Sequence, residues 1–305
     1  MDMRAIISQL AVLFILLALG YVGYKLKALS ADTSKALTKL VFNITLPLSI
    51  LSSVIGGDIV THGGQTAIFM LMTLGVYAVY VVISLPAARL LTKEKGLRGL
   101  YAFMMIFSNV AFMGFPVTSA IFGPQALFYN TLFNIPFWIS SFSFGLMMIA
   151  GEKGRFRPKS LLTPLFISSM LVIPLALTGF RAPMIIQDAV RIAGNITTPA
   201  SMIIIGITLA QEPIRGVFKN LKLYPLSLFK LIIIPVAVWL VFRPFIESDL
   251  TLGVIVILSG MPTASIAAMF AIEFGNNEAE ASAGVFITTL LSAVTIPLLV
   301  YFLLI

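Results

Sequence analysis

The sequence contains no cysteine and a single histidine, His62, among its 305 residues. The lack of cysteine excludes a disulfide framework, a thiolate metal site and a thiol nucleophile. One histidine cannot build a histidine-ligated metal site. Charged residues are also scarce, at 10% of the chain against about 25% in ordinary soluble proteins. So few charges cannot cover a water-facing surface, which excludes a soluble globular enzyme, and disordered chains are richer in charge than this one.

Apolar residues make up 59% of the chain, and they fall into long runs. A membrane-spanning helix needs about 20 such residues, so the chain is predicted to be an all-α polytopic membrane protein. We expect ten transmembrane helices, roughly at 5–24, 35–56, 66–90, 98–122, 125–150, 161–179, 190–211, 222–243, 251–274 and 279–304. No phosphate-binding loop, nucleotide fingerprint or catalytic serine arrangement is present. We therefore expect no enzyme, no catalytic residues, no metal and no cofactor.

The basic residues that give the net charge of +8 gather on one side of the predicted membrane. The loops after the first, third and fifth spans hold four each, and the loop after the seventh holds three. The opposite side holds four in all. By the positive-inside rule the rich side is cytoplasmic, so both termini of this cell-membrane protein face outward. The basic clusters indicate orientation and headgroup contact, and they give no support for nucleic acid as a partner.

Two short motifs recur at about half the chain length. Asn43–Pro47 reads NITLP and Asn195–Pro199 reads NITTP, whereas a Gly-x-Pro motif occurs at 114–116 and again at 260–262. These pairs predict two five-helix repeats, 1–152 and 161–305, joined by a cytoplasmic linker at 153–160. Because five is odd, the repeats are inverted in the membrane, which is the construction of secondary transporters.

The first pair of motifs places polar groups inside predicted helices. A proline in a helix leaves the carbonyl four residues earlier without its partner, which in each motif is the asparagine carbonyl. An amide, a hydroxyl and a carbonyl then lie within about one turn and form a supporting polar cluster or a cation site. The residues concerned are Asn43, Thr45, Asn195 and Thr197.

The second pair predicts interruptions in the fourth and ninth spans. Gly114 and Gly260 tolerate an unwound backbone two residues before Pro116 and Pro262. A broken helix offers a new N-terminus with unpaired amide donors and partial positive charge, which suits a carboxylate. An ordinary proline kink between packed helices is the alternative.

Three further residues carry two interpretations each. Asn109 lies five residues before Gly114 and either faces a substrate cavity or holds helices together. Lys230 lies inside the eighth span and either reaches the headgroups or has a functional role. Glu273 closes the ninth span as a coupled proton carrier or as a solvated helix end.

At this level of detail the sequence resembles the auxin efflux carrier family, which includes plant PIN-type exporters and bacterial malate and malonate carriers. The resemblance rests on Asn109 to Pro116 (NVAFMGFP) in the fourth span and on Pro262 to Phe274 in the ninth. Thr288 to Pro297 and Asn43 to Pro47 add to it. It covers the whole chain, and the short loop between the halves is typical of a prokaryotic or minimal member.

The resemblance implies ten helices in two inverted repeats, with broken helices 4 and 9 crossing each other. It implies a scaffold domain and a transport domain, each drawn from both repeats, and small organic anions as substrates. It also carries Asn109, Pro116 and Pro262 over as substrate-site positions. Thr263 and Ala264, which follow Pro262, depart from the plant pattern, and this departure weighs against auxin itself as the substrate.

We therefore predict a secondary carrier of small organic anions, an auxin-like monocarboxylate or a malate-type dicarboxylate, working by alternating access. A sodium-coupled bile-acid-type symporter and a channel remain as alternatives. Na+ and H+ are the candidate coupling ions, and a homodimer is a further expectation. The predicted substrate-binding residues are Asn109, Gly114, Pro116, Gly260, Pro262, Thr263, Asn43 and Asn195. The predicted coupling residues are Thr45, Thr197, Lys230 and Glu273.

Overall fold

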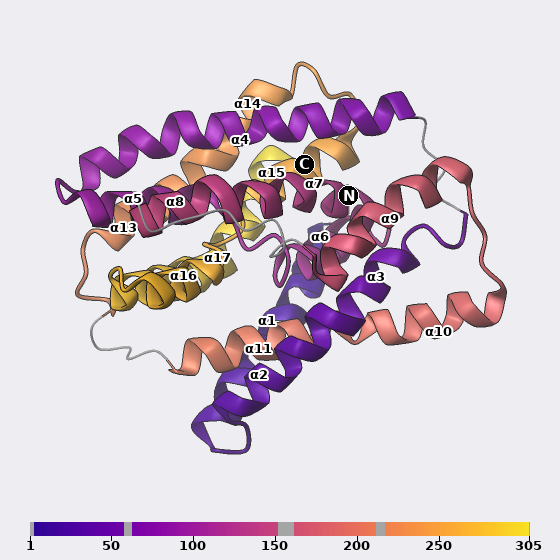
Figure 1. Ribbon diagram of the computed structural model, residues 1–305, viewed down its shortest axis with the longest axis horizontal. Helices are drawn as coiled ribbons and strands as arrows, with labels where there is room; N and C mark the ends of the chain where they lie inside the picture. Colours follow the sequence, from indigo (N-terminus) through magenta and orange to yellow (C-terminus); the bar gives the residue numbers. More distant parts are fainter. Residues whose placement is uncertain (1–2, 58–62, 152–161, 212–216, 305) are drawn as a thin grey trace. The chain divides into compact units, whose positions relative to one another are not determined.

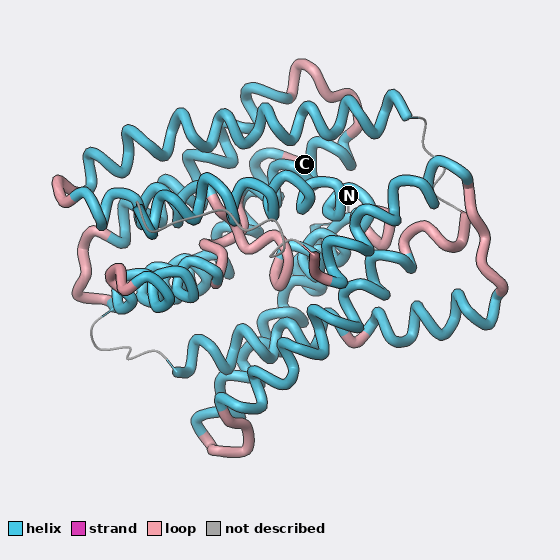
Figure 2. Tube along the Cα trace, in the orientation of Figure 1, coloured by secondary structure: helices cyan, strands magenta, loops and turns pink. Residues whose placement is uncertain are grey.

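The computed structural model describes residues 3–57, 63–151, 162–211 and 217–304. The predicted linker at 153–160 lies outside these ranges. Regular structure in the described residues is helical throughout (Figure 2), as predicted for an all-α protein. The first half contains α1 Met3–Lys25, α2 Ala31–Leu40, η1 Val41–Thr45, α3 Leu46–Ser52, α4 Gly63–Leu91, α5 Lys95–Ile106, α6 Gly114–Phe122, α7 Ala126–Ser140, η2 Ser141–Gly145 and α8 Leu146–Ala150. The second half contains α9 Pro164–Thr178, α10 Met184–Asn195, α11 Thr197–Gln211, α13 Leu223–Leu228, η5 Phe229–Ile233, α14 Ile234–Phe242, α15 Asp249–Ser259, α16 Ile266–Phe274 and α17 Glu278–Leu303.

Helix occupies most of each of the ten predicted ranges, but the helices differ in length. Among the described residues, six stretches are long and apolar enough to cross a membrane: Arg4–Lys25, Gly64–Leu91, Ala126–Ala150, Met184–Gln211, Leu223–Phe242 and Glu278–Leu303. The helices Pro164–Thr178 and Asp249–Ser259 are apolar but shorter. The prediction of a multi-pass helical membrane protein is confirmed. The count of ten spans and their inverted arrangement stay predictions.

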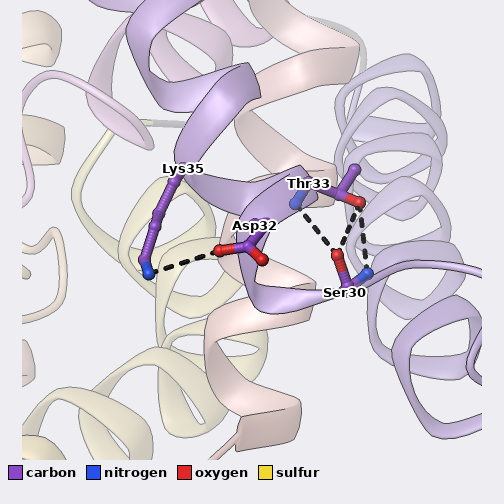
Figure 3. Close-up of polar contacts among 4 residues, drawn as sticks. All are labelled: Ser30, Asp32, Thr33 and Lys35. Atoms are coloured by element: carbon purple, nitrogen blue, oxygen red, sulfur yellow. Dashed lines mark hydrogen bonds and ion pairs between the residues drawn. The ribbon is translucent and has the colours of Figure 1, made fainter.

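Sequence signals at helix ends explain several boundaries, and α2 shows this most clearly. The Ser30 hydroxyl accepts a hydrogen bond from the Thr33 amide at 3.2 Å, and the Thr33 hydroxyl accepts from the Ser30 amide at 3.2 Å (Figure 3). This capping box satisfies two amide donors that a helix start leaves unpaired. An exposed ion pair between Lys35 and Asp32 at 3.4 Å lies in the same turn, although a pair so exposed adds little stability.

Pro47 is accommodated without a break in the helical path. The π-helical turn η1 ends at Thr45, and Pro47 then lies in the first turn of α3, where its missing N–H costs no helical hydrogen bond. The π-helical turn η5 precedes Pro235 in the same manner before α14. The extra residue in each π-helical turn shifts the hydrogen-bond register before the proline. The second and eighth spans therefore stay helical at these points.

The chain forms two compact units, each assembled from both halves of the sequence. Unit 1 comprises Met1–Met72, Ala111–Pro136 and Lys159–Gln211, and unit 2 comprises Thr73–Val110, Phe137–Pro158 and Glu212–Ile305. In unit 1, α11 packs along α1 and also contacts α2, while α3 packs against α9 and α10 (Figure 1). In unit 2, α17 packs against α13 and α16, and α5 packs against α8 (Figure 1).

The contact between α1 and α11 in unit 1 depends on glycine. A methyl group added at Gly206 would overlap backbone atoms of Leu17 and Tyr21, and one added at Gly20 would overlap the backbone of Ile203. Small residues let two helix backbones approach closely, which is how helices associate where lipid removes the hydrophobic driving force.

Candidate functional site

Two helices are interrupted close to the predicted glycine and proline positions. Helix α5 ends at Ile106 and α6 begins at Gly114, whereas α15 ends at Ser259 and α16 begins at Ile266. Unit 2 contains residues 107–110 of the first interruption and all of 260–265. We call these two segments of unit 2 the crossing.

Backbone hydrogen bonds hold the two segments of the crossing antiparallel. The Asn109 amide donates to the Pro262 carbonyl at 2.7 Å, and the Ala264 amide donates to the Phe107 carbonyl at 2.9 Å. Ser108 and Thr263 form an isolated antiparallel bridge between them. Non-helical backbone at membrane depth is tolerated only where its polar groups find partners inside the protein. Pro262 has no N–H to satisfy, so its carbonyl is all that it must pair.

Thr263 links the crossing to the end of α5. Its hydroxyl donates to the Met104 carbonyl at 2.9 Å, and its amide donates to the Thr288 hydroxyl of α17 at 3.2 Å. The Thr288 hydroxyl in turn donates to the Gly284 carbonyl at 2.7 Å. Met104 lies in the last turn of α5, where carbonyls lose their helical partners. The Thr263 hydroxyl therefore acts as a side-chain cap for α5.

Lys230 projects from η5 toward the same place and is fully buried. Its ammonium donates to the Met105 carbonyl at 3.1 Å, to the Ser108 hydroxyl, and to the Ser259 carbonyl at 3.4 Å. The Tyr80 ring lies 5.5 Å from the Lys230 Nζ, a cation–π distance. Lys230 thus reaches the interior, so the snorkelling interpretation is wrong for this side chain.

Tyr80 completes the polar group around the end of α15. Its hydroxyl donates to the Ser259 Oγ at 2.6 Å, and Ser259 donates to the Ile255 carbonyl at 2.7 Å. No role was predicted from the sequence for Tyr80, Ser108 or Ser259. The positions of Ser108 and Ser259 at the edges of the two interruptions could have identified them. The contact made by Tyr80 depends on how α4 packs, which the sequence does not show.

Asn109 is 5% exposed, and its side-chain amide forms no hydrogen bond to the described residues. Ser265, at the start of α16, likewise makes no side-chain capping bond. An uncapped helix N-terminus and an unengaged amide are both groups that bind carboxylate oxygens. Gly260 allows close packing, because a methyl group there would overlap the Leu299 side chain.

The other predicted substrate residues of the fourth span belong to unit 1. Gly114 begins α6, and Pro116 lies in its first turn, where a proline is tolerated. The Gly114 carbonyl accepts from the Thr118 hydroxyl at 2.7 Å, and that hydroxyl accepts from the Asn130 amide at 3.1 Å. The Asn134 amide donates to the Asn130 Oδ1 at 2.7 Å, so a buried chain of polar groups supports the start of α6.

The paired motifs of the two halves meet within unit 1 through their threonines. The buried Thr197 hydroxyl lies 3.1 Å from the buried Thr45 hydroxyl. Asn43 and Asn195 are exposed, and the Asn43 amide donates to the Lys39 carbonyl at 2.8 Å. The structure therefore brings the threonines together and leaves the asparagines outside this contact.

Acidic residues are found at the ends of α16 and α17. Glu273 is exposed in the last turn of α16. Glu280 accepts from the Tyr101 hydroxyl and, at 2.6 Å, from the Asn220 amide, a set of contacts within unit 2 that the sequence prediction missed. Among the described residues, no group of three or more His, Cys, Asp or Glu side chains is placed to hold a metal ion.

Comparison with known proteins finds transporters that are similar over nearly the whole chain. The chain is 27% identical over 299 residues to an uncharacterized transporter of Methanothermobacter thermautotrophicus, covering 93% of this chain and 94% of that protein. It is 24% identical over 300 residues to an uncharacterized transporter of Methanocaldococcus jannaschii, covering 94% and 95%. The profile of a transporter family, described as membrane transport protein, matches residues 5–159 and 154–300. The chain therefore belongs to the membrane transport protein (Mem_trans) family, that of the auxin efflux carriers, and is a membrane transporter rather than an enzyme.

Proposed function

We propose that this transporter is a secondary carrier of small organic anions that works by alternating access. The observation that carries the proposal is the crossing, where two interrupted helices hold each other by reciprocal backbone bonds between Asn109 and Pro262 and between Ala264 and Phe107. Carriers built from broken helices bind their substrates beside such unwound segments. The family assignment supports a carrier, and the chemistry of the crossing supports an anion.

Three features of unit 2 favour a carboxylate at the crossing. The side-chain amide of Asn109 has no hydrogen-bond partner among the described residues, the start of α16 lacks a side-chain cap, and Lys230 adds a positive charge nearby. The described residues place no carboxylate in an ion pair with Lys230. The positive charge of Lys230 and the free donors would not stabilise the binding of a neutral or cationic substrate.

The proposal includes ten spans in two inverted repeats, with both termini outside. Each half contains five helical segments, and in each half the fourth one is interrupted: α5 and α6 in the first half, α15 and α16 in the second. Unit 2, which contains the crossing, is the proposed transport domain, and unit 1 is the proposed scaffold. The homodimer stays a prediction, as do the contributions of Gly114, Pro116, Asn43 and Asn195 to the substrate site. Glu273 stays a predicted proton carrier.

The substrate test begins with the purified protein and a thermal-shift screen of mono- and dicarboxylates, each with and without sodium and at two pH values. The carboxylate that raises Tm most is then measured for binding to Asn109→Ala and to the control Gln125→Ala. Gln125 is an exposed amide in a loop outside the crossing. We expect Asn109→Ala to lose binding at least tenfold while Gln125→Ala keeps it. Equal affinities of the two variants would reject the site.

A second test separates a carrier from a channel. Proteoliposomes loaded with unlabelled anion should accumulate labelled anion transiently, because a carrier exchanges one for the other and saturates. Flux at single-channel rates without counterflow would reject the carrier.

Orientation is tested with a C-terminal tag in intact cells. A tag accessible from outside supports the ten-span topology, and a tag protected until the cells are permeabilised contradicts it.

A further inference from the structure

Lys230 lies where two helix C-termini converge in unit 2. Met105 is in the last turn of α5, Ser259 is the last residue of α15, and both carbonyls accept from the Lys230 ammonium. The C-terminal end of a helix carries about half a negative charge. Two such ends brought together in a buried place favour a cation between them, and the Lys230 side chain occupies that position.

The partners of Lys230 are all uncharged. They are two carbonyls, the Ser108 hydroxyl and the face of the Tyr80 ring. An ammonium has three N–H donors and no acceptor, which matches the three oxygens around Lys230. Carbonyl and hydroxyl oxygens are also the groups with which broken-helix carriers coordinate a sodium ion, at unwound backbone and half-helix C-terminal ends.

The π-helical turn η5 positions the Lys230 side chain for its contacts with the two helix ends. The π-helical turn precedes Pro235 and holds the side chain fully buried, and π-helical turns occur frequently at functional sites. A lysine that merely supported a helix would not need three oxygens from two interrupted helices.

We propose that Lys230 is a tethered cation that replaces a coupling sodium ion at the C-terminal ends of α5 and α15. It is a positioning residue, since it fixes the crossing by compensating both helix ends. Because the cation is covalently attached, it does not leave during the cycle, and anion binding is independent of sodium. The statement about anion binding rests on the proposed function, but the one about the cation site does not.

The test without a substrate uses thermal unfolding of the intact protein in choline, sodium and methylammonium chloride at equal ionic strength. Lys230→Ala should lower Tm in choline chloride by about 5 °C or more, because buried carbonyls lose their partner. Methylammonium or sodium should then raise the Tm of Lys230→Ala, with saturation, and leave that of the wild type unchanged. Lys230→Met fills the space without charge and should show the loss without the recovery. The control Lys222→Ala changes an exposed lysine and should behave as the wild type.

The proposal is overturned if neither cation raises the Tm of Lys230→Ala more than that of the wild type, or if sodium stabilises the wild type itself. If Lys230→Ala does not fold, the proposal is tested with the wild type and with Lys230→Arg. Lys230→Arg keeps the positive charge, so sodium should leave the Tm of both proteins unchanged. Transport assays add one arm: carboxylate uptake by the wild type should be unchanged when choline replaces sodium, and sodium dependence would reject the proposal. Recovery of Lys230→Ala by a cation in a protein that binds no carboxylate would reject the proposed function and leave the tethered cation standing.

Discussion

Replacing Thr263 by valine should weaken the crossing by removing one hydroxyl. Valine has nearly the same shape, so the packing around this fully buried side chain is retained. The change leaves the Met104 carbonyl without the bond it receives at 2.9 Å. Met104 lies in the last turn of α5, where carbonyls lose their helical amide partners. Leaving a buried acceptor unsatisfied costs about 1–3 kcal/mol, so we expect about 2 kcal/mol for Thr263→Val.

Thr131→Val is the matched control. Thr131 is equally buried, and its hydroxyl donates to the Leu127 carbonyl at 2.7 Å, four residues earlier in the same helix. That carbonyl keeps its helical amide partner, so the loss should stay below about 1 kcal/mol. Thermal unfolding in one detergent or nanodisc preparation should show a Tm about 4 °C lower for Thr263→Val than for the wild type. The reasoning is refuted if Thr263→Val loses no more than Thr131→Val.

Three further outcomes follow from contacts within unit 1 or within unit 2. Gly206→Ala should sharply reduce the yield of folded protein, because the added methyl overlaps the backbone of α1, whereas Gly64→Ala, with open space around it, should leave the yield unchanged. A double-mutant cycle of Thr45→Val and Thr197→Val should give a coupling of about 0.5 kcal/mol or more in unfolding experiments, and additive effects would contradict the contact at 3.1 Å. Glu280→Ala should lower Tm, because two hydrogen bonds, one from α5 and one from the loop before α13, lose their common acceptor, and an unchanged Tm would show that these bonds are replaced by water.

Local sequence signals predicted that the fourth and ninth spans are interrupted. In the fourth span the interruption lies just before Gly114, because Gly114 and Pro116 form the first turn of α6. Gly260 and Pro262 mark the break after α15, because glycine tolerates and proline enforces loss of the helical hydrogen-bond pattern. Pro47, for which no interruption is predicted, does not interrupt its helix. A π-helical turn before α3 absorbs this proline, since the turn shifts the register by one residue before the missing N–H is needed. The presence of a proline in the sequence does not show whether the turn before it can adopt the wider π-helical form.

The partners of buried polar groups were not predictable in the same way. Asn109 and Lys230 were identified because an amide or an amine is costly in a membrane. Their contacts depend on segments more than a hundred residues away, such as the Pro262 carbonyl for the backbone amide of Asn109 and the Met105 carbonyl for the Lys230 ammonium. Tyr80 and Ser259 carried no signal of their own, because hydroxyl residues are common on apolar helices.

The sequence by itself determined that this protein is a helical membrane transporter. The scarcity of charge, the apolar runs and the family motifs are local or additive properties, and each can be read without knowing which helices touch. Only the tertiary structure decided what the polar residues do. It paired Thr45 with Thr197, left Asn43 and Asn195 exposed, and directed Lys230 to two helix ends. Those outcomes depend on where buried carbonyls lose their helical partners and which distant side chain is near enough to replace them.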